Sequence, residues 1–157
     1  MLRIKGNITD ENPRVPAPAA PFRHKMKVQM RFTDIDMLGH VNNNAYLSYM
    51  DLAKVNYFSE VLPEGMDWRT VSAVIVHIDC DYFSPAYFEE PLVVSTTIVS
   101  VSQRSFRMEQ RVVNDVTGQT KCVCTTIMAG FDPKTAVGRP LDRFWVEHVE
   151  RYESRTL

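Results

Sequence analysis

Two carboxylates and an imidazole, from Asp34, Asp36 and His40, lie in one short segment directly before the asparagines at positions 42–44. Asparagine is a preferred residue at the start of a helix. A helix start presents free backbone N–H groups and the positive end of the helix dipole, and both favour a developing negative charge. The segment around Gly39 is therefore predicted to be a loop that points acidic groups toward a site for an anion.

This pairing suits acyl transfer from a thioester. The carbonyl oxygen of a thioester becomes an oxyanion when the carbonyl carbon is attacked, and a backbone donor aimed at that oxygen is worth about 10²–10³ in rate. The leaving thiol has a pKa of about 8.5, as cysteine does, so it departs with little help from an acid. One carboxylate can then suffice, and the chain needs no Ser-His-Asp set.

The elements on either side of this loop are predicted from their hydrophobic patterns. Apolar and polar residues alternate over 25–32, ending at Phe32, which indicates a half-buried strand. Over 44–62 the apolar residues recur with the period of a helix, for which Asn42 or Asn43 would provide the N-terminal cap. The apolar stripe is wider than one helical face, so we expect the helix to be surrounded by protein.

The chain after this helix is predicted to form β structure, in four strands connected as a meander, because short connections favour antiparallel neighbours. In the first of these strands the even-numbered residues of 74–82 are expected to share one face, whereas His77, Asp79 and Asp81 form a polar row on the other. A second helix is expected near 141–152. The strands are expected at 71–83, 92–102, 105–113 and 119–131. The fold class is α+β, a five-stranded antiparallel sheet wrapped around one long central helix.

Length and charge narrow the classes of protein to consider. The chain of 157 residues fits one domain, large enough to bury a core without a metal or a disulfide. Its 18 basic and 19 acidic residues nearly balance, which argues against a nucleic acid or an anionic membrane as partner. Cys80, Cys122 and Cys124 show no paired spacing, and no signal peptide is recognised, so we expect reduced thiols and a cytoplasmic location.

Prolines at positions 13, 16, 18 and 21, with alanines between them, mark the beginning of the chain as different from the rest. Such a composition favours extended backbone and offers little apolar surface to bury. We therefore expect residues 1–22 to form a disordered or extended arm, and residues 23–157 to form the folded domain.

The sequence D-x-D-x-x-G-H-V-N-N-x-x-Y-x-x-Y, which runs from Asp34 to Tyr49, resembles the signature of hotdog-fold acyl-CoA thioesterases. The resemblance is to the family of 4-hydroxybenzoyl-CoA thioesterase, in the branch of bacterial long-chain acyl-CoA thioesterases. Residues 82–86 and 89–92 also look like the family's turn between its second and third strands. The resemblance covers residues from about 24 to 150 and leaves out the arm.

This resemblance implies the hotdog fold and the hydrolysis of an acyl-CoA thioester to a free acid and coenzyme A, and no cofactor is expected. The segment around His40 lacks a spacing typical of a zinc site, so no metal is expected either. It implies that Asp36 is the general base or the nucleophile, and that the backbone amides of Asn43 and Asn44 polarise the thioester carbonyl. Where many relatives have glutamate and arginine on the helix, this chain has Asp51 and Lys54. The residues expected to support the site are Gly39, His40, Asn42, Tyr46 and Asp51.

The resemblance also implies a homodimer or a homotetramer with sites at the subunit interface. The partner is acyl-CoA, or the thioester of an acyl carrier protein, and neither a nucleic acid nor a membrane is expected. Another branch of hotdog thioesterases uses a helix carboxylate, which makes Asp51 a second candidate for catalysis. Asp34 is interpreted as a structural acid near the helix start.

Two other functions stay open on the sequence. Some hotdog hydratases and dehydratases place an aspartate and a histidine near the helix start, as Asp36 and His40 are placed here. A binding module for acyl-CoA without catalysis is the second alternative, because a fold does not determine its chemistry.

Overall fold

The structure is a computed structural model and describes residues 11–64 and 71–157. Within these residues the strands are β1 (His24–Lys27), β2 (Ala73–Tyr82), β3 (Leu92–Val101), β4 (Ser105–Asn114), β5 (Thr120–Asp132) and β6 (Val137–Gly138). The helices are the short 3-10 helix η1 (Phe32–Asp34), α1 (Asn43–Val61) and α2 (Arg143–Glu153). The predicted strands after α1 and both predicted helices agree with the observed bounds to within two residues.

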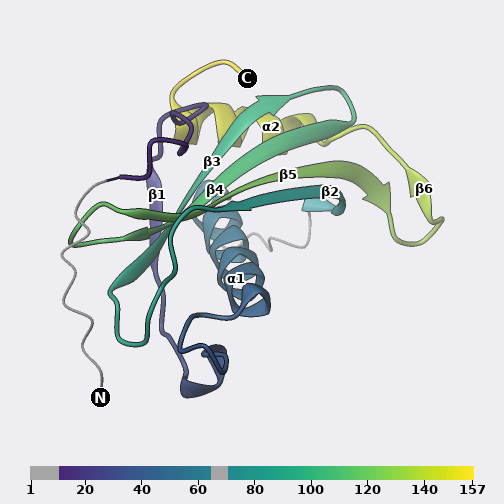
Figure 1. The fold of residues 1–157 in the computed structure, drawn as a ribbon. Helices are drawn as coiled ribbons and strands as arrows, with labels where there is room; N and C mark the ends of the chain where they lie inside the picture. The colour runs from purple at the N-terminus through teal and green to yellow at the C-terminus, as the bar shows by residue number, and fades with distance from the viewer. Residues whose placement is uncertain (1–10, 65–70) are drawn as a thin grey trace.

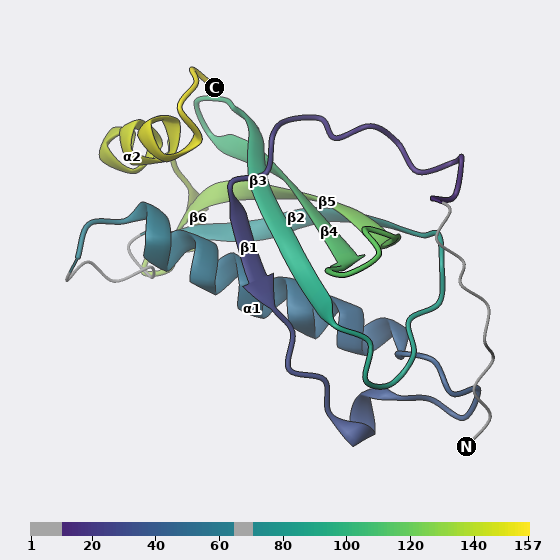
Figure 2. The ribbon, with the colours of Figure 1, turned by 90° about the vertical axis from the view of Figure 1, so that its left-hand side faces the viewer.

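The strands form one antiparallel sheet that curves around α1 (Figures 1 and 2). Their order is β1-β3-β4-β5-β2, and β6 adds to β5 at one end. This arrangement confirms the α+β hotdog fold with one long central helix. Neither α1 nor α2, within the part of the chain that the structure describes, is long and apolar enough to cross a membrane.

The predicted four-strand meander was wrong for β2. This strand pairs with β5, and β3 pairs with β1 and β4. The connection 83–91 therefore has to cross from one edge of the sheet toward the other, rather than turn back in a hairpin. Because it crosses at the end where α1 begins, it becomes a neighbour of the loop that precedes α1 (Figure 2).

Helix α1 begins where its cap residue dictates. The side chain of Asn42 accepts a hydrogen bond from the Asn44 amide at 2.9 Å, so Asn42 rather than Asn43 is the N-cap. The apolar stripe faces the sheet, and Ala53 and Tyr57 are fully buried. Leu52 is 64% exposed on the opposite side, so the described residues of one subunit leave part of the helix uncovered.

Strand β1 is shorter than the sequence predicts. It pairs with β3 only over His24–Lys27, although the alternation of burial continues through Met26, Val28 and Met30, which pack against the core. The prediction was wrong for Phe32, whose side chain is 83% exposed. The chain leaves the sheet there and turns into η1, because the Asp34 carboxylate accepts a hydrogen bond from the Arg31 amide at 2.8 Å.

The predicted face of β2 was also wrong in part. Its register against β5 shifts between Ile75 and His77, so Val76 is an extra residue in a β-bulge. After the bulge Cys80 lies opposite Cys124 on the helix side of the sheet. Before it, the same side is taken by Ile75, and the face that carries His77 also carries Val74. A one-residue shift reverses the faces of a strand, and alternation alone cannot place it.

The core has two parts along α1. One part packs under the first half of the helix and includes Val41, Tyr46 and Met50. The other packs under the second half, where α2 covers it, with the Phe106 and Trp145 rings 4.7 Å apart between their centroids. The end of α1 near its first turn therefore carries the loops, and the other end carries α2 (Figure 2).

The arm over residues 11–22 contains a turn at 13–14 but no helix or strand, and it lies along the sheet on the face away from α1. The Ala19 amide donates to Glu109 at 3.2 Å, and the guanidinium of Arg111 lies 5.8 Å from the centre of the Phe22 ring. The Glu11 carboxylate accepts from the Thr120 amide at 3.0 Å. The first part of the predicted arm, residues 1–10, lies outside the described residues.

Candidate active site

Asp36 lies in a tight hairpin between η1 and α1. The Asp36 amide donates to the His40 carbonyl at 2.8 Å, and the Gly39 amide donates to the Asp36 carbonyl at 3.0 Å. Ile35 and Val41 form an isolated antiparallel bridge at the base of this hairpin. Gly39 has a φ of +79°, which a residue without a side chain adopts at little cost. The predicted loop is thus a defined turn that holds Asp36 and His40 in register.

One oxygen of the Asp36 carboxylate is held by this turn. Oδ1 accepts hydrogen bonds from the Leu38 amide at 2.9 Å and from the His40 amide at 3.3 Å. Within residues 11–64 and 71–157, no hydrogen bond is formed to Oδ2. The half-buried carboxylate therefore has a fixed direction, and one of its oxygens has no hydrogen-bond partner among these residues.

Asp34 is a structural acceptor that joins the loop to the helix. Its Oδ2 accepts from the Tyr49 hydroxyl at 2.7 Å, and its carbonyl accepts from the Asn42 amide at 2.7 Å. Burial, and after it the bond to the Asp34 carboxylate, raise the pKa of Tyr49 above its usual value, so the hydroxyl stays a donor. These contacts account for Asp34 without a catalytic role.

The two amides expected as oxyanion donors differ in their surroundings. The Asn44 amide is already bonded to the Asn42 side chain, and the Ala45 amide donates to the Asn42 carbonyl at 2.9 Å. The Asn43 amide donates to no residue that the structure describes. It is one of the unsatisfied donors of a helix start, and the exposed surface at this position leaves it open to a ligand.

His40 and Tyr46 support the loop from two sides. The His40 ring packs edge-on against Tyr87, with 5.2 Å between the ring centres, and Tyr46 packs in the same way against Tyr82 at 5.3 Å. Tyr46 is buried, with only 3% of its surface exposed. Burial is the main reason that the pKa of Tyr46 is raised above its usual value.

Asp51 is not brought together with Asp36 in this chain. It is exposed and forms an ion pair at 2.9 Å with Lys54, whose side chain is only 8% exposed. It lies about 12 Å along the helix axis from Asn43, given a rise of about 1.5 Å per residue. Any contact between Asp51 and a substrate at Asn43 would therefore need the substrate to extend along α1 or a second subunit.

One wall of the site was missed in the sequence analysis. The Ala86 carbonyl, in the connection 83–91, accepts from the Val41 amide at 2.8 Å, and Tyr87 forms a bridge with His40. A signal was present in the family-like turn at 82–86 and 89–92, but it carried no information on what the turn contacts. Its function as a backing for the Asp36 hairpin follows from the crossing of 83–91, which sequence alone did not reveal.

Two surface pockets lie at the α2 end of the molecule. One, of about 270 Å³, lies between the turn after β3 and α2, and the other, of about 340 Å³, lies between the end of α1 and α2. Neither is lined by a residue of the predicted site. No group of three or more histidine, cysteine or acidic side chains among the described residues is arranged to hold a metal.

Comparison with known proteins places the chain in a family. The model of the thioesterase-like superfamily matches residues 30–148. The long-chain acyl-CoA thioesterase FadM of Escherichia coli (strain K12) is 22% identical over 128 residues, which cover 80% of this chain and 96% of FadM. The uncharacterized protein YsmA of Bacillus subtilis (strain 168) is 31% identical over 78 residues, 48% of this chain and 52% of YsmA, so that match spans about half of the relative.

A solved structure agrees with this assignment. A thioesterase from Thermus thermophilus, complexed with coenzyme A and Zn, superposes with a TM-score of 0.77 at 29% identity, over 87% of this chain and 98% of that chain. These findings confirm the expected hotdog fold and the thioesterase class, and hydrolysis of acyl-CoA thioesters is the activity that they support. The chain belongs to the thioesterase-like superfamily.

Proposed function

We propose that this protein hydrolyses acyl-CoA thioesters to free acids and coenzyme A, with Asp36 as the catalytic carboxylate. The observation that carries the proposal is the pairing at the start of α1. There a carboxylate with one bonded oxygen precedes a helix whose Asn43 amide has no acceptor among the described residues. A nucleophile or base beside a free oxyanion donor is the minimum that thioester hydrolysis requires.

The reaction follows from these two groups. Oδ2 of Asp36 either takes a proton from a water that attacks the thioester carbon, or attacks that carbon itself to form an anhydride that water then opens. In both cases the carbonyl oxygen becomes an oxyanion that the Asn43 amide stabilises, and the C–S bond breaks. The thiolate leaves and takes up a proton, so the products are the acid and the free thiol of coenzyme A. Asn44 would join as a second donor only if the Asn42 cap opened.

A second copy of the chain is part of this proposal. Strand β2 pairs with β5 along one edge, and among the described residues its other edge pairs with nothing. The exposed side chains of this strand include Ile75, Val76 and Ile78, between 41% and 59% exposed. A long apolar edge strand is a surface that proteins cover. We infer a homodimer or homotetramer in which two β2 strands pair antiparallel about a twofold axis.

The cytoplasm is the proposed location, since coenzyme A thioesters are the substrate. An acyl carrier protein thioester presents the same reacting carbonyl and is the alternative substrate. Acyl-chain preference would follow from the walls that two subunits form together.

A panel of thioesters tests the proposal. Thiol release would be measured with acetyl-, hexanoyl-, palmitoyl- and benzoyl-CoA, each with the wild type and with Asp36→Asn. We expect hydrolysis of at least one substrate by the wild type and its loss in the variant. Binding without thiol release from any of the four would favour an acyl-CoA-binding module, and water addition to an unsaturated acyl-CoA would favour a hydratase.

A further inference from the structure

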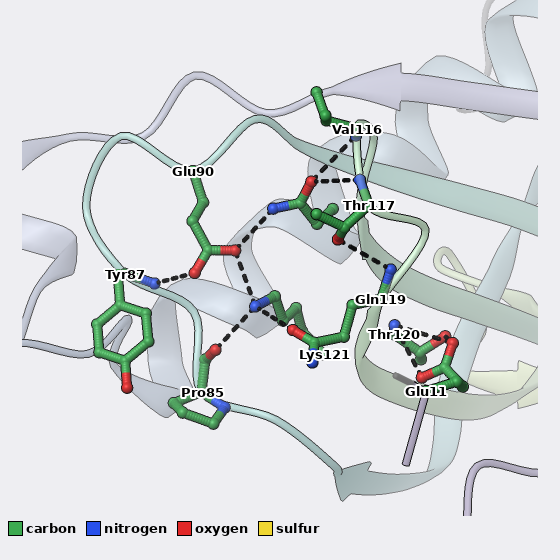
Figure 3. A network of polar contacts seen from close by, with 10 residues as sticks. Glu11, Pro85, Tyr87, Glu90, Val116, Thr117, Gln119, Thr120 and Lys121 are labelled. Atoms are coloured by element: carbon green, nitrogen blue, oxygen red, sulfur yellow. Dashed lines mark hydrogen bonds and ion pairs between the residues drawn. The ribbon is translucent and has the colours of Figure 1, made fainter. Parts of the chain in front are cut away.

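A buried lysine lies behind the wall of the site. The side chain of Lys121, on β5, is 4% exposed, and its ammonium forms an ion pair with Glu90 at 2.8 Å (Figure 3). The same ammonium donates to the Pro85 carbonyl at 3.0 Å and to the Gln119 side chain at 2.8 Å. Three acceptors satisfy the three N–H groups of an ammonium, so Lys121 has the full set of partners that a buried charge requires.

Glu90 uses both carboxylate oxygens in the same network. Oε1 accepts from the Tyr87 amide at 3.0 Å, and Oε2 accepts from the Asn114 side chain at 2.9 Å as well as from Lys121. The Asn114 side chain in turn accepts from the Val116 amide at 3.0 Å, in the turn between β4 and β5 (Figure 3). The loop 83–91 is thereby anchored to two regular strands.

The anchored segment is the one that touches the Asp36 hairpin. Between Pro85 and Tyr87 lies Ala86, which is fully buried and accepts the Val41 amide at 2.8 Å. Tyr87 forms its bridge with His40, whose carbonyl accepts the Asp36 amide. Three hydrogen bonds and the short backbone segments between them therefore connect Lys121, through 85–87, to the backbone that carries Asp36.

The backbone of the loop itself shows that it is held by its surroundings. Glu89 has a φ of 68°, in the left-handed region that a residue with a side chain adopts at a cost. A strained residue persists when the contacts on both sides determine its conformation. The residue after Glu89 is Glu90, and the hydrogen bonds and ion pair of its two carboxylate oxygens fix the backbone on that side. Replacing both members of a buried ion pair by apolar side chains of similar volume is often neutral for the stability of a fold, so stability alone does not account for the pair of Lys121 and Glu90.

We propose that Lys121 and Glu90 are positioning residues for the hydrolytic site. They fix 85–87 from behind, and this segment fixes His40 and Val41. The direction of the Asp36 carboxylate and the place of the Asn43 amide then follow. The inference rests on the proposed function of Asp36. A displacement of about 1 Å at a reacting group can cost about 10²-fold in rate, so loss of the network acts on turnover more than on substrate binding.

The substitution Lys121→Met tests this, because it keeps an unbranched side chain and removes the three donors. Below the unfolding transition, kcat on the best substrate of the panel should fall about 10–100-fold, with KM changed less than about threefold. Hydrogen exchange of the Val41 amide should become faster, since its acceptor on Ala86 is no longer held. Glu90→Gln keeps an acceptor for Tyr87 and removes the charge, and it provides the test if Lys121→Met fails to fold.

The control is a second buried carboxylate far from Asp36. Glu153, on α2, accepts hydrogen bonds from Tyr57 and Thr97 at the other end of α1. If Glu153→Gln and Lys121→Met lose stability and kcat to the same extent, the network is only structural and the proposal is overturned. If the losses of Lys121→Met and Glu90→Gln are simply additive when combined, the two residues do not act as one unit, which also contradicts it.

Failure of the proposed function is separable from failure of this inference. A wild type that hydrolyses none of the thioesters would refute the assignment of Asp36. The exchange rate of the Val41 amide would still report whether Lys121 and Glu90 hold 85–87 in place. Unchanged exchange in both Lys121→Met and Glu90→Gln would overturn the positioning role whatever the substrate is.

Discussion

A glutamate with several hydrogen-bond partners lies near each end of α1, and the partners of the two glutamates differ in kind. At the α2 end, Glu153 is buried and accepts from the Tyr57 hydroxyl at 2.7 Å and from the Ile98 amide at 3.2 Å. These partners belong to a regular helix and a regular strand. At the Asp36 end, Glu90 and Lys121 instead hold a loop, 83–91, which meets the Asp36 hairpin through one isolated bridge, between Tyr87 and His40.

The two sets of contacts are expected to matter for different properties, the stability of the fold at the Glu153 end and the position of the loop 83–91 at the Glu90 end. Removing the Glu153 contacts would weaken the attachment of α2, but α1 and β3 would keep their own hydrogen bonds and the core beneath them. The middle of the loop 83–91 belongs to no strand and lacks such regular backbone pairing. Its side-chain polar contacts therefore have a larger part in deciding where its atoms lie. The same chemical group, a carboxylate with several donors, thus joins a regular helix and a regular strand at one end and, in our proposal, positions the loop behind Asp36 at the other.

The largest effect on turnover is expected from a substitution of Asp36, which should change the stability of the fold little. Asp36→Asn keeps an acceptor for the Leu38 and His40 amides and removes the basic oxygen. We expect kcat to fall by at least about 10²–10⁴ with a much smaller change in KM and in stability. Steady-state kinetics measure kcat and KM, and thermal unfolding measures the stability.

The matched change at the second candidate is Asp51→Asn. It should cost less than about tenfold in kcat, because an exposed ion pair to Lys54 contributes little. The reverse result, with Asp51→Asn inactive and Asp36→Asn nearly intact, would mean that the helix carboxylate is catalytic and that our assignment of Asp36 is wrong.

The next effect concerns the edge strand β2, which belongs to neither end. A lysine in place of Val76, which is 59% exposed, should prevent pairing with a second copy and lower activity at least about tenfold. Light scattering should then give a mass near 18.1 kDa, that of one chain. Val137→Lys is the control, because Val137 is 60% exposed in the short strand β6. A wild type that is monomeric and fully active would contradict the shared site.

A smaller effect on activity, but a clear one on stability, is expected from Glu153→Gln. The substitution weakens charge-assisted hydrogen bonds from Tyr57 and Thr97, each worth about 1.5–3 kcal/mol. Since about 1 kcal/mol shifts Tm by about 2–4 °C in a domain of this size, the midpoint should fall by several degrees. At 25 °C kcat should stay within about twofold. A larger loss of kcat would contradict the proposed difference between Glu153, which we expect to affect stability, and Glu90 with Lys121, which we expect to affect turnover.

The smallest effect on activity is expected from removal of the arm. A chain that starts at Phe22 should stay folded and keep kcat within about twofold, although it loses the Glu11 contact to Thr120, next to Lys121 on β5. Each hydrogen bond removed costs about 0.5–1.5 kcal/mol, so Tm should fall by a few degrees. Loss of the oligomer in this chain, seen by light scattering, would instead assign the arm to assembly.

Sequence alone determined the parts of this protein that depend on near neighbours. The Asn42 cap, the turn at Gly39 and the periodicity over 44–62 are local signals, and they located the loop, the start of α1 and the position of Asp36 between them. The alternation in 105–113 likewise placed Met108 on the inner face, where it is fully buried. Such signals act within a few residues, so one chain read in order is sufficient for them.

Tertiary structure decided what depends on partners distant in sequence. Pairing with β5 introduced the bulge at Val76, and the order of strands sent 83–91 across the start of α1. Lys121 donates a hydrogen bond to Pro85, which is 36 residues away in the sequence, and no sequence pattern around either residue predicts this contact. Register and long-range contacts arise from the packing of one strand on another, and the free energy of that packing belongs to the pair rather than to either segment.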